Sequence, residues 1–308
     1  MCITGIFWSD NIRPAYKCMD GKIVKTHRGI YYVDADRVIP CKARGLFRDQ
    51  GLKPTVGDNV RLRISEEDGS GYIEEVYPRK NQLLRPYVSN VDHVMIVMSV
   101  HSPDINPYLL DRFLLMCTKS QVEAIIVVNK SDLLSEEDRE WIRSIYEPIG
   151  YPLFLTSVVE RSGIEEVRNL ILGKTTVFAG PSGVGKSSLL NAITGGKWQP
   201  ETGEISNRTR RGKHTTRHAE LFHFEEDTFL VDTPGFSSLD ITFLEDEREI
   251  KTLMPDFIRY ADCRFNDCNH IEEPGCGVKH ALANHLISPI RYENYKLIYH
   301  ERKSMKMY

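Results

Sequence analysis

Short runs of β-branched and aromatic residues alternate with turn-forming residues in the first quarter of the chain. The strands that this pattern predicts span residues 30–33, 38–41, 59–64 and 71–73. Several short strands broken by Gly, Pro, Asn and Asp are typical of a small β-barrel. We therefore expect a barrel domain over residues 19–86, after an extension of unknown role over residues 1–18.

After residue 86 the pattern changes to apolar runs that alternate with amphipathic stretches. The apolar runs predict strands at 91–100, 122–128, 153–155, 175–179 and 229–231, and the amphipathic stretches predict helices at 107–120, 136–149, 164–172 and from Lys186. Strands that alternate with helices in this way form mostly parallel sheets. The sequence thus predicts an α/β domain over residues 87–245, followed by a small helical domain, residues 246–308, that carries a Cys/His cluster.

The composition is that of an ordinary soluble protein. Of the 308 residues, 41% are hydrophobic and 27% are charged, and the net charge is −3. The longest apolar stretch, residues 94–100, is far shorter than the roughly 18–20 residues that a membrane helix needs. The N-terminus also lacks the basic region and apolar core of a signal peptide. A cytoplasmic protein with no membrane partner is expected.

Basic and aromatic residues are interleaved in the predicted barrel. Residues 20–86 hold 13 Lys/Arg and 10 Asp/Glu together with Tyr31, Tyr32, Phe47 and Tyr72. Aromatic rings stack on unpaired bases and basic side chains contact the phosphate backbone, so this mixture suits RNA binding. A structural barrel with a solvated, mixed surface is the alternative interpretation.

A phosphate-binding motif lies between a predicted strand and a predicted helix, where residues 180–187 match G-x-x-x-x-G-K-[ST]. In this motif backbone N–H groups and the helix N-terminus bind phosphate oxygens, Lys186 reaches the β- and γ-phosphates, and the Ser187 hydroxyl ligates Mg²⁺. A chance glycine-rich turn is the alternative. The predicted nucleotide-binding residues are Gly180, Pro181, Ser182, Gly183, Val184, Gly185, Lys186, Ser187 and Ser188, with Lys186 also assigned to catalysis.

The tetrapeptide D-x-x-G, residues 232–235, follows the predicted strand 229–231 directly. The Asp232 carboxylate at that strand end can hold the magnesium shell, and the Gly235 amide can contact a γ-phosphate as part of catalysis. Alone the tetrapeptide is a weak signal, since turns at strand ends are rich in Asp and Gly. Its position about fifty residues after the phosphate loop makes the assignment strong.

The predicted strand 122–128 ends in N-K-x-D, the base-reading motif of GTPases, formed by Asn129, Lys130, Ser131 and Asp132. The Asp132 carboxylate can accept the N1–H and the N2 amino protons of guanine, whereas N1 of adenine is itself an acceptor. Thr156 and Ser157, after the next strand, resemble the companion element whose backbone amide contacts guanine O6. These motifs predict a GTP site and oppose an ATP-using kinase or helicase.

The motifs occur in an unusual order along the chain. In Ras-like GTPases the phosphate loop comes first, whereas here N-K-x-D precedes it. All of these loops lie at the carboxyl edge of one sheet, so a circular permutation leaves the site intact. The D-x-x-G loop then leads almost directly into the C-terminal segment, which gives a γ-phosphate-dependent movement a short covalent route to that segment.

Four metal-binding side chains crowd together near the C-terminus: Cys263, Cys268, His270 and Cys276. Three thiolates and one imidazole fill the four positions of a tetrahedral zinc ion, so a structural site is expected and a catalytic one is disfavoured. The segment is too short and too polar to bury a large core, and zinc would supply the missing stability. Reduced, unliganded cysteines are the alternative.

Together these motifs resemble the RsgA family, also called YjeQ or YloQ, of GTPases that depend on the small ribosomal subunit. The resemblance runs from about residue 19 to the C-terminus. It implies an OB-fold, a circularly permuted GTPase domain and a zinc-binding domain. It further implies a GTP hydrolase that binds the small (30S) subunit and 16S rRNA near the decoding region late in maturation, and whose hydrolysis the subunit stimulates. We expect a monomer that uses GTP and GDP, Mg²⁺ and one structural Zn²⁺.

The segment 211–216 is similar to the switch element of that family, and residues 208–217 contain five basic residues and no acidic ones. Thr215 or Thr216 would ligate Mg²⁺. Phe236 stands where Ras-like proteins carry the glutamine that orients the attacking water, and an apolar ring cannot do this. His214 is therefore the predicted catalytic residue, with contact to RNA as the competing interpretation. A rival from another class is an RNA-binding placeholder whose nucleotide signals occupancy and whose hydrolysis only times release.

Overall fold

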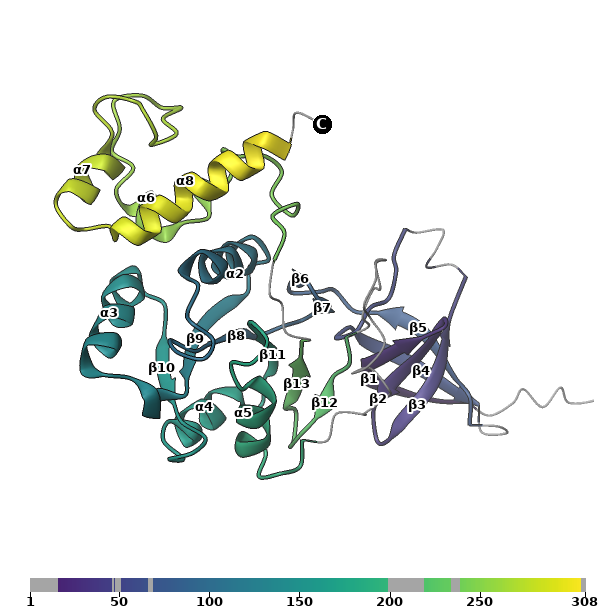
Figure 1. Cartoon of the computed structure of the whole chain (residues 1–308). Coiled ribbons are helices and arrows are strands. Elements are labelled where there is room, and N and C mark those ends of the chain that lie inside the picture. The colour runs from purple at the N-terminus through teal and green to yellow at the C-terminus, as the bar shows by residue number, and fades with distance from the viewer. Residues whose placement is uncertain are drawn as a thin grey trace, which may run out of the picture. The chain divides into compact units, whose positions relative to one another are not determined.

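The computed structural model describes residues 16–45, 47, 51–65, 69–198, 219–233 and 239–305. The chain divides into two compact units, Met1–Arg79 and Lys80–Tyr308 (Figure 1). Across the described residues, we find no helix with both the length and the apolar character that a membrane span requires.

The first unit is a closed five-stranded barrel, with its strands hydrogen-bonded in the order β1-β2-β3-β5-β4. β3 and β5 pair in parallel, and the other neighbours pair antiparallel. This OB-like arrangement confirms the predicted barrel. The strands are β1 (Tyr16–His27), β2 (Ile30–Asp34), β3 (Val38–Ala43), β4 (Asn59–Ser65) and β5 (Gly71–Val76).

The barrel begins earlier in the chain than residue 19, where the sequence pattern places its start. β1 starts at Tyr16, so residues 16–18, assigned above to the N-terminal extension, pair with residues 63–65 of β4. Lys17 and Cys18 are both exposed, and the stretch therefore lacks the apolar alternation that marks a half-buried strand.

The second unit is built on a six-stranded sheet in the order β10-β9-β8-β11-β13-β12. All neighbouring strands are parallel except β12 and β13, which confirms the predicted α/β fold. β8, β9 and β11 are buried along nearly their whole length, as strands covered on both faces should be. The strands are β8 (His93–Met98), β9 (Glu123–Asn129), β10 (Leu153–Thr156), β11 (Thr175–Ala179), β12 (Phe222–His223) and β13 (Phe229–Asp232).

Three short strands are absent from the sequence prediction. They are β12 and the two strands of a hairpin, β6 (Gln82–Leu84) and β7 (Tyr87–Ser89). Runs of two or three residues are too short to show a hydrophobic period.

Helices connect the parallel strands, and the local sequence fixes where two of them begin. Asn106 caps α2 by accepting a hydrogen bond from the Leu109 N–H at 3.1 Å. Ser135 and Asp138 form a reciprocal capping box at the start of α3. The connecting helices are α2 (Pro107–Lys119), α3 (Glu136–Tyr146), α4 (Ile164–Ile171) and α5 (Lys186–Ile193), with the short helices η1 (Ser131–Leu133) and η2 (Glu147–Ile149) beside α3.

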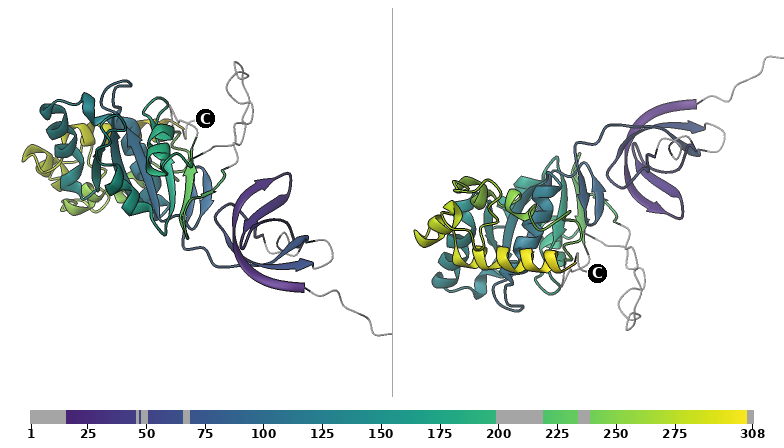
Figure 2. Two further views of the ribbon diagram at one scale, coloured as in Figure 1. Left: turned by 90° about the horizontal axis from the view of Figure 1, so that it is seen from below. Right: turned by 90° about the horizontal axis from the view of Figure 1, so that it is seen from above.

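The C-terminal part of the second unit is helical, and none of its described residues forms a strand. Phe257, Tyr295 and Ile298 are buried there in a core that also includes Leu115 of α2. The long helix α8 lies beside α2 (Figures 1 and 2). The division of residues 87–308 into two domains stays a prediction. The helices are η3 (Ile250–Thr252), α6 (Pro255–Arg259), α7 (Gly277–Ala283) and α8 (Pro289–Ser304).

A buried ion cluster joins α8 to α2 and α6. The Arg291 side chain is 1% exposed, and its guanidinium contacts Asp111 at 2.5 Å and Asp256 at 2.8 Å. Asn294 donates to the second Asp111 oxygen at 2.6 Å. Buried charges are tolerated when they are paired and hydrogen-bonded in this way, so the cluster fixes how the C-terminal helices pack on the sheet domain.

Candidate nucleotide and metal sites

The phosphate loop leaves the buried strand β11 and enters α5, as the motif predicts. Gly180 has a φ of +139°, and a Cβ there would lie 2.1 Å from the Val97 carbonyl oxygen of β8. Gly185 has a φ of +91°, and a Cβ there would lie 2.5 Å from Asn129 Nδ2. Only glycine fits both positions, so the conformation of the loop explains two of the motif's residues.

Lys186, the first residue of α5, points back over the loop. Its ammonium donates to the carbonyl oxygens of Gly180 at 3.0 Å and of Pro181 at 2.8 Å. Burial lowers the pKa of Lys186, and the nearby Asp232 carboxylate opposes that shift. A buried cation beside a helix N-terminus is suited to a bound anion, and the cavity at this point is lined by Ser182, Gly183, Gly185, Lys186, Ser187, Ser188, Asp232 and Thr233.

Asp232, at the end of β13, faces the start of α5. Its Oδ2 accepts a hydrogen bond from the Ser187 hydroxyl at 3.2 Å, and its buried Oδ1 has no hydrogen-bond partner among the described residues. Burial raises the pKa of Asp232, whereas the Lys186 ammonium and the Ser187 hydroxyl lower it. A buried carboxylate oxygen without a partner, next to a serine hydroxyl, is the hard-oxygen donor set that Mg²⁺ prefers.

The N-K-x-D loop at the end of β9 is bonded to the phosphate loop. The Asn129 amide donates to the Val184 carbonyl oxygen at 2.9 Å and accepts from the Thr156 hydroxyl at 3.1 Å. Lys130, with a φ of +62°, donates to the Gly183 carbonyl oxygen at 2.8 Å and to that of Ser102. The two loops therefore form one rigid arrangement although they are about fifty residues apart in the chain.

Asp132 is oriented by residues from two neighbouring segments. The Ser157 hydroxyl donates to Asp132 Oδ1 at 2.5 Å and accepts from the Glu160 N–H at 3.1 Å. Arg139 of α3 donates to the Ser131 carbonyl oxygen at 2.8 Å. This role of Arg139 could not be predicted from the sequence, because no local motif relates a helix residue to a carbonyl eight positions earlier.

The structure thus brings most of the predicted nucleotide-site residues to one edge of the sheet. They follow β10, β9, β11 and β13, which are four of five consecutive parallel strands, with β8 between β9 and β11. The remaining predicted residues, His214, Thr215 and Gly235, lie outside the described residues, as do Thr216 and Phe236.

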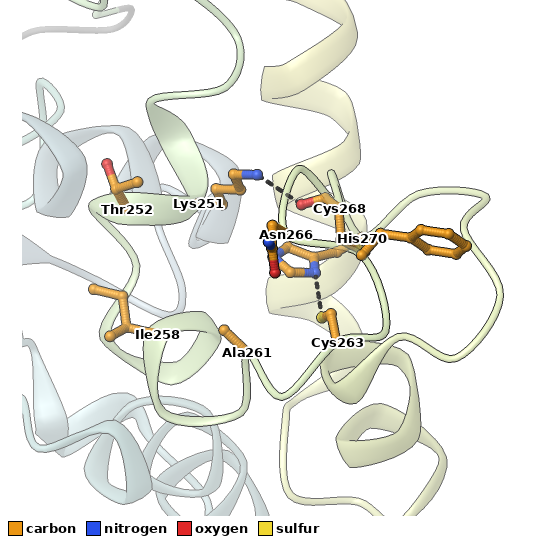
Figure 3. Close-up of a pocket in the computed structure, with 9 residues that line it drawn as sticks. Lys251, Thr252, Ile258, Ala261, Cys263, Asn266, Cys268 and His270 are labelled. Atoms are coloured by element: carbon orange, nitrogen blue, oxygen red, sulfur yellow. Dashed lines mark hydrogen bonds between the residues drawn. The ribbon is translucent and has the colours of Figure 1, made fainter.

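Four sulfur and nitrogen donors converge in the C-terminal helical part, and no other group of three or more such donors is found in the described chain. The donor atoms of Cys263, Cys268, His270 and Cys276 all lie within 4.8 Å of one another. His270 Nδ1 is 3.5 Å from Cys263 Sγ (Figure 3). It is 3.3 Å from Cys276 Sγ, and the sulfurs of Cys263 and Cys276 are 3.9 Å apart. With Zn–S near 2.3 Å, ligands of a tetrahedral zinc ion lie roughly 3.5–3.8 Å apart. The distances among Cys263, His270 and Cys276 are close to this range, and the four donors are of the kind that zinc binds.

The protonation of His270 also suits a metal. Burial lowers the pKa of His270 to about 4, so its ring is neutral at physiological pH and can offer a lone pair. Burial raises the pKa of Cys268 to about 12, which leaves a thiolate unfavourable unless a cation is present. The convergence of three thiol groups and one neutral imidazole favours a metal site over unliganded cysteines.

The sheet, its phosphate loop and its N-K-x-D loop define a P-loop GTPase domain in circularly permuted order, which follows an OB-like barrel in the sequence. The chain matches the family models "RsgA GTPase" over residues 76–242 and "RsgA N-terminal domain" over residues 20–73. It therefore belongs to the RsgA GTPase family.

Relatives over nearly the whole chain agree with this assignment. The "Small ribosomal subunit biogenesis GTPase RsgA" of Agathobacter rectalis is 44% identical over 304 residues, covering 94% of this chain and 100% of the relative. The protein of the same name from Alkaliphilus metalliredigens is 46% identical over 291 residues, covering 94% and 99%.

Two solved structures are also similar to this chain. YjeQ from Thermotoga maritima superimposes with a TM-score of 0.78 at 40% identity, covering 92% of this chain and 98% of that one. YloQ, described as a circularly permuted GTPase, gives a TM-score of 0.76 at 34% identity, covering 94% and 96%.

Proposed function

We propose that this protein hydrolyses GTP as a late maturation factor of the small ribosomal subunit. The observation that carries the proposal is the bonding of the N-K-x-D loop to the phosphate loop through Asn129 and Lys130. That arrangement supports simultaneous contact with a guanine base and with phosphates. The relatives named as small ribosomal subunit biogenesis GTPases support the cellular role.

In this proposal Asp132 reads the guanine N1–H and N2 protons, while the Ser157 hydroxyl keeps its carboxylate in place. The loop from Gly180 to Ser188 binds the phosphates. Mg²⁺, when bound, neutralises phosphate charge; Ser187 and the unpartnered oxygen of Asp232 would hold it, together with Thr215 or Thr216.

Hydrolysis needs a residue that positions water, and we assign this role to His214. Gly235 would contact the γ-phosphate through its amide. His214 enters the proposal from the switch-like segment 211–216, and Gly235 enters it from the D-x-x-G motif. The apolar Phe236 that follows Gly235 cannot orient water, so another residue must do this. If His214 instead contacts RNA, its replacement should weaken subunit binding rather than turnover.

The partner in this proposal is the small subunit through 16S rRNA, and the protein acts as a cytoplasmic monomer. The barrel supplies aromatic and basic side chains, and Arg61, for instance, lies 5.8 Å from the centre of the Tyr77 ring. One structural zinc ion held by Cys263, Cys268, His270 and Cys276 would stabilise the C-terminal helices.

The test is the rate of GTP hydrolysis with and without purified small subunits, for the wild type and for Asp132→Ala. Strong stimulation that Asp132→Ala loses at low GTP concentration would support the proposal. An RNA-binding placeholder would instead bind subunits in a GTP-dependent manner without a faster rate. Equal turnover of GTP and ATP by the wild type would contradict the assignment of the base-reading loop.

A further inference from the structure

The zinc-ligand turn, defined here as residues 268–272, carries two of the four metal donors. His270 in its middle has a φ of +62°, a left-handed conformation that a non-glycine residue adopts only when its surroundings enforce it. This conformation directs Nδ1 toward the sulfurs of Cys263 and Cys276, at 3.5 and 3.3 Å. The surroundings of the turn must therefore supply the constraint.

Glu273 accepts hydrogen bonds from N–H groups of the turn. Its Oε1 accepts from the Asn269 N–H at 2.9 Å, and its Oε2 accepts from the N–H groups of Ile271 at 3.0 Å and Glu272 at 3.2 Å. Partial burial disfavours its charge, yet the backbone hydrogen bonds, that of Asn269 foremost, lower the pKa of Glu273 to about 2. The carboxylate is thus ionised throughout the physiological range.

Side chains from two other elements hold the carbonyl side of the same turn. Lys251 donates to the Cys268 carbonyl oxygen at 2.7 Å (Figure 3). Two tyrosines of α8 bind the next two carbonyl oxygens: Tyr295 donates to the Asn269 carbonyl oxygen at 2.5 Å, and Tyr292 donates to the His270 carbonyl oxygen at 2.7 Å. Three N–H groups and three carbonyl oxygens of the turn are therefore hydrogen-bonded to side chains outside it.

We propose that Glu273 is a positioning residue for the zinc ion. Its carboxylate holds the zinc-ligand turn in the conformation in which Cys268 and His270 face Cys263 and Cys276. Glu273 is not itself among the converging donors, and both of its oxygens are already engaged by backbone N–H groups. It acts through the ligands by fixing the backbone that carries them. This inference rests on the zinc site proposed above.

The decisive variant is Glu273→Gln, with Glu272→Gln as its matched control. Glutamine keeps one acceptor oxygen but places an NH₂ donor against N–H groups that need an acceptor. The Glu272 side chain is exposed, so the control removes the same charge one residue away and leaves the backbone N–H groups and the Glu273 carboxylate unchanged. Loss of residues that orient metal ligands typically weakens metal binding about 10–100-fold.

We expect full-length Glu273→Gln to release zinc to a chromogenic chelator at least about tenfold faster than the wild type, with Glu272→Gln unchanged. After replacement of zinc by cobalt, the saturated Glu273→Gln protein should keep the wild-type thiolate and tetrahedral absorption bands, because the ligands are the same. A lost or shifted band would make Glu273 a ligand and overturn the positioning role.

Two other results would also overturn the inference: a wild-type release rate for Glu273→Gln, or an equal acceleration in Glu272→Gln, which would indicate a general charge effect. If Glu273→Gln does not fold, the rate of zinc release is measured for Tyr292→Phe instead. This substitution removes one hydrogen-bond donor to the turn and keeps the buried ring. Faster zinc release by folded Tyr292→Phe would support the constraint on the turn, and an unchanged rate would refute it. A wild-type protein without zinc would instead contradict the zinc site itself.

Discussion

Replacement of Arg291 by methionine should strongly destabilise the second unit. Arg291 is 1% exposed and offers three short contacts to two buried carboxylates: to Asp111 at 2.5 Å and to Asp256 at 2.8 and 3.1 Å. Arg291→Met would leave Asp111 and Asp256 buried without their cation. Breaking a buried ion pair in this way costs about 3–5 kcal/mol.

For a folded unit of this size, each kcal/mol lowers the unfolding midpoint by about 2–4 °C, so a decrease of about 6–20 °C is expected. The control is Lys296→Met on the same helix, which breaks a partly exposed pair with Glu293 at 2.7 Å and should cost only about 0–1 kcal/mol. Urea unfolding followed by circular dichroism measures both free energies.

The pH dependence provides a second check on the same reasoning. Burial raises the pKa of Asp111, and the Arg291 guanidinium opposes that rise. Without the guanidinium, the folded-state pKa lies further above the unfolded value of about 3.9. A carboxyl group whose pKa is raised in the folded state stabilises the folded protein at low pH. This stabilisation is lost as the pH rises through the folded-state pKa. The difference in the free energy of unfolding between the wild type and Arg291→Met should therefore be largest at neutral pH and become smaller on acidification.

If the free energy of unfolding of Arg291→Met lies within about 1 kcal/mol of the wild-type value at neutral pH, the two buried carboxylates do not depend on this cation. A variant that combines Arg291→Met with Asp111→Asn and Asp256→Asn should recover part of the loss, since no charge then stays buried. If the combined variant is less stable than Arg291→Met, lost packing rather than stranded charge explains the effect.

The sequence predicts the parts of this fold that depend on local pattern. The apolar runs that became β8, β9 and β11 are long and continuous, and the predicted strand 175–179 coincides with β11, Thr175–Ala179. The glycines of the phosphate loop are predictable as well, because their motif implies close backbone approach, and Gly180 indeed lies against Val97. Motif order alone indicates the permutation.

Contacts between distant segments could not be predicted in the same way. The pairing of Arg291 with Asp111 joins residues 180 positions apart, and nothing near either residue identifies its partner. The hydrogen bond from Lys130 to the Gly183 carbonyl oxygen spans 53 positions. Such contacts depend on how helices and loops are placed over the sheet, which hydrophobic periodicity does not encode.

The permuted order gives the C-terminal helices a physical connection to the nucleotide site. Residues 239–249 follow the D-x-x-G loop, and Arg302 of α8 donates to the carbonyl oxygens of Leu244 at 2.9 Å and Glu245 at 2.7 Å. Lys119 at the end of α2 contacts Glu249 at 2.7 Å. The loop before α2 is in turn bonded to Lys130 through Ser102. α2 therefore contacts the segment after D-x-x-G at one end and adjoins the base-reading loop at the other.

Three further predictions concern the proposed sites. Cys268→Ser should lower the zinc content of the purified protein and destabilise the C-terminal helices while GTP affinity stays nearly constant, because the metal donors lie outside the nucleotide site; normal zinc content would refute this. His214→Ala should abolish most of the subunit-stimulated rate yet leave GTP affinity unchanged, since neither nucleotide loop is altered, and a full stimulated rate would remove His214 from catalysis. Asp132→Asn should lose GTP and gain xanthosine triphosphate, because an amide replaces a carboxylate that accepts two protons from guanine. The Ser157 hydroxyl, 2.5 Å from Asp132 Oδ1, can still donate to the amide oxygen, so the substituted side chain should keep its orientation. Competition binding with both nucleotides measures the exchange of preference, and an Asp132→Asn protein that prefers GTP by the wild-type margin would show that another residue reads the base.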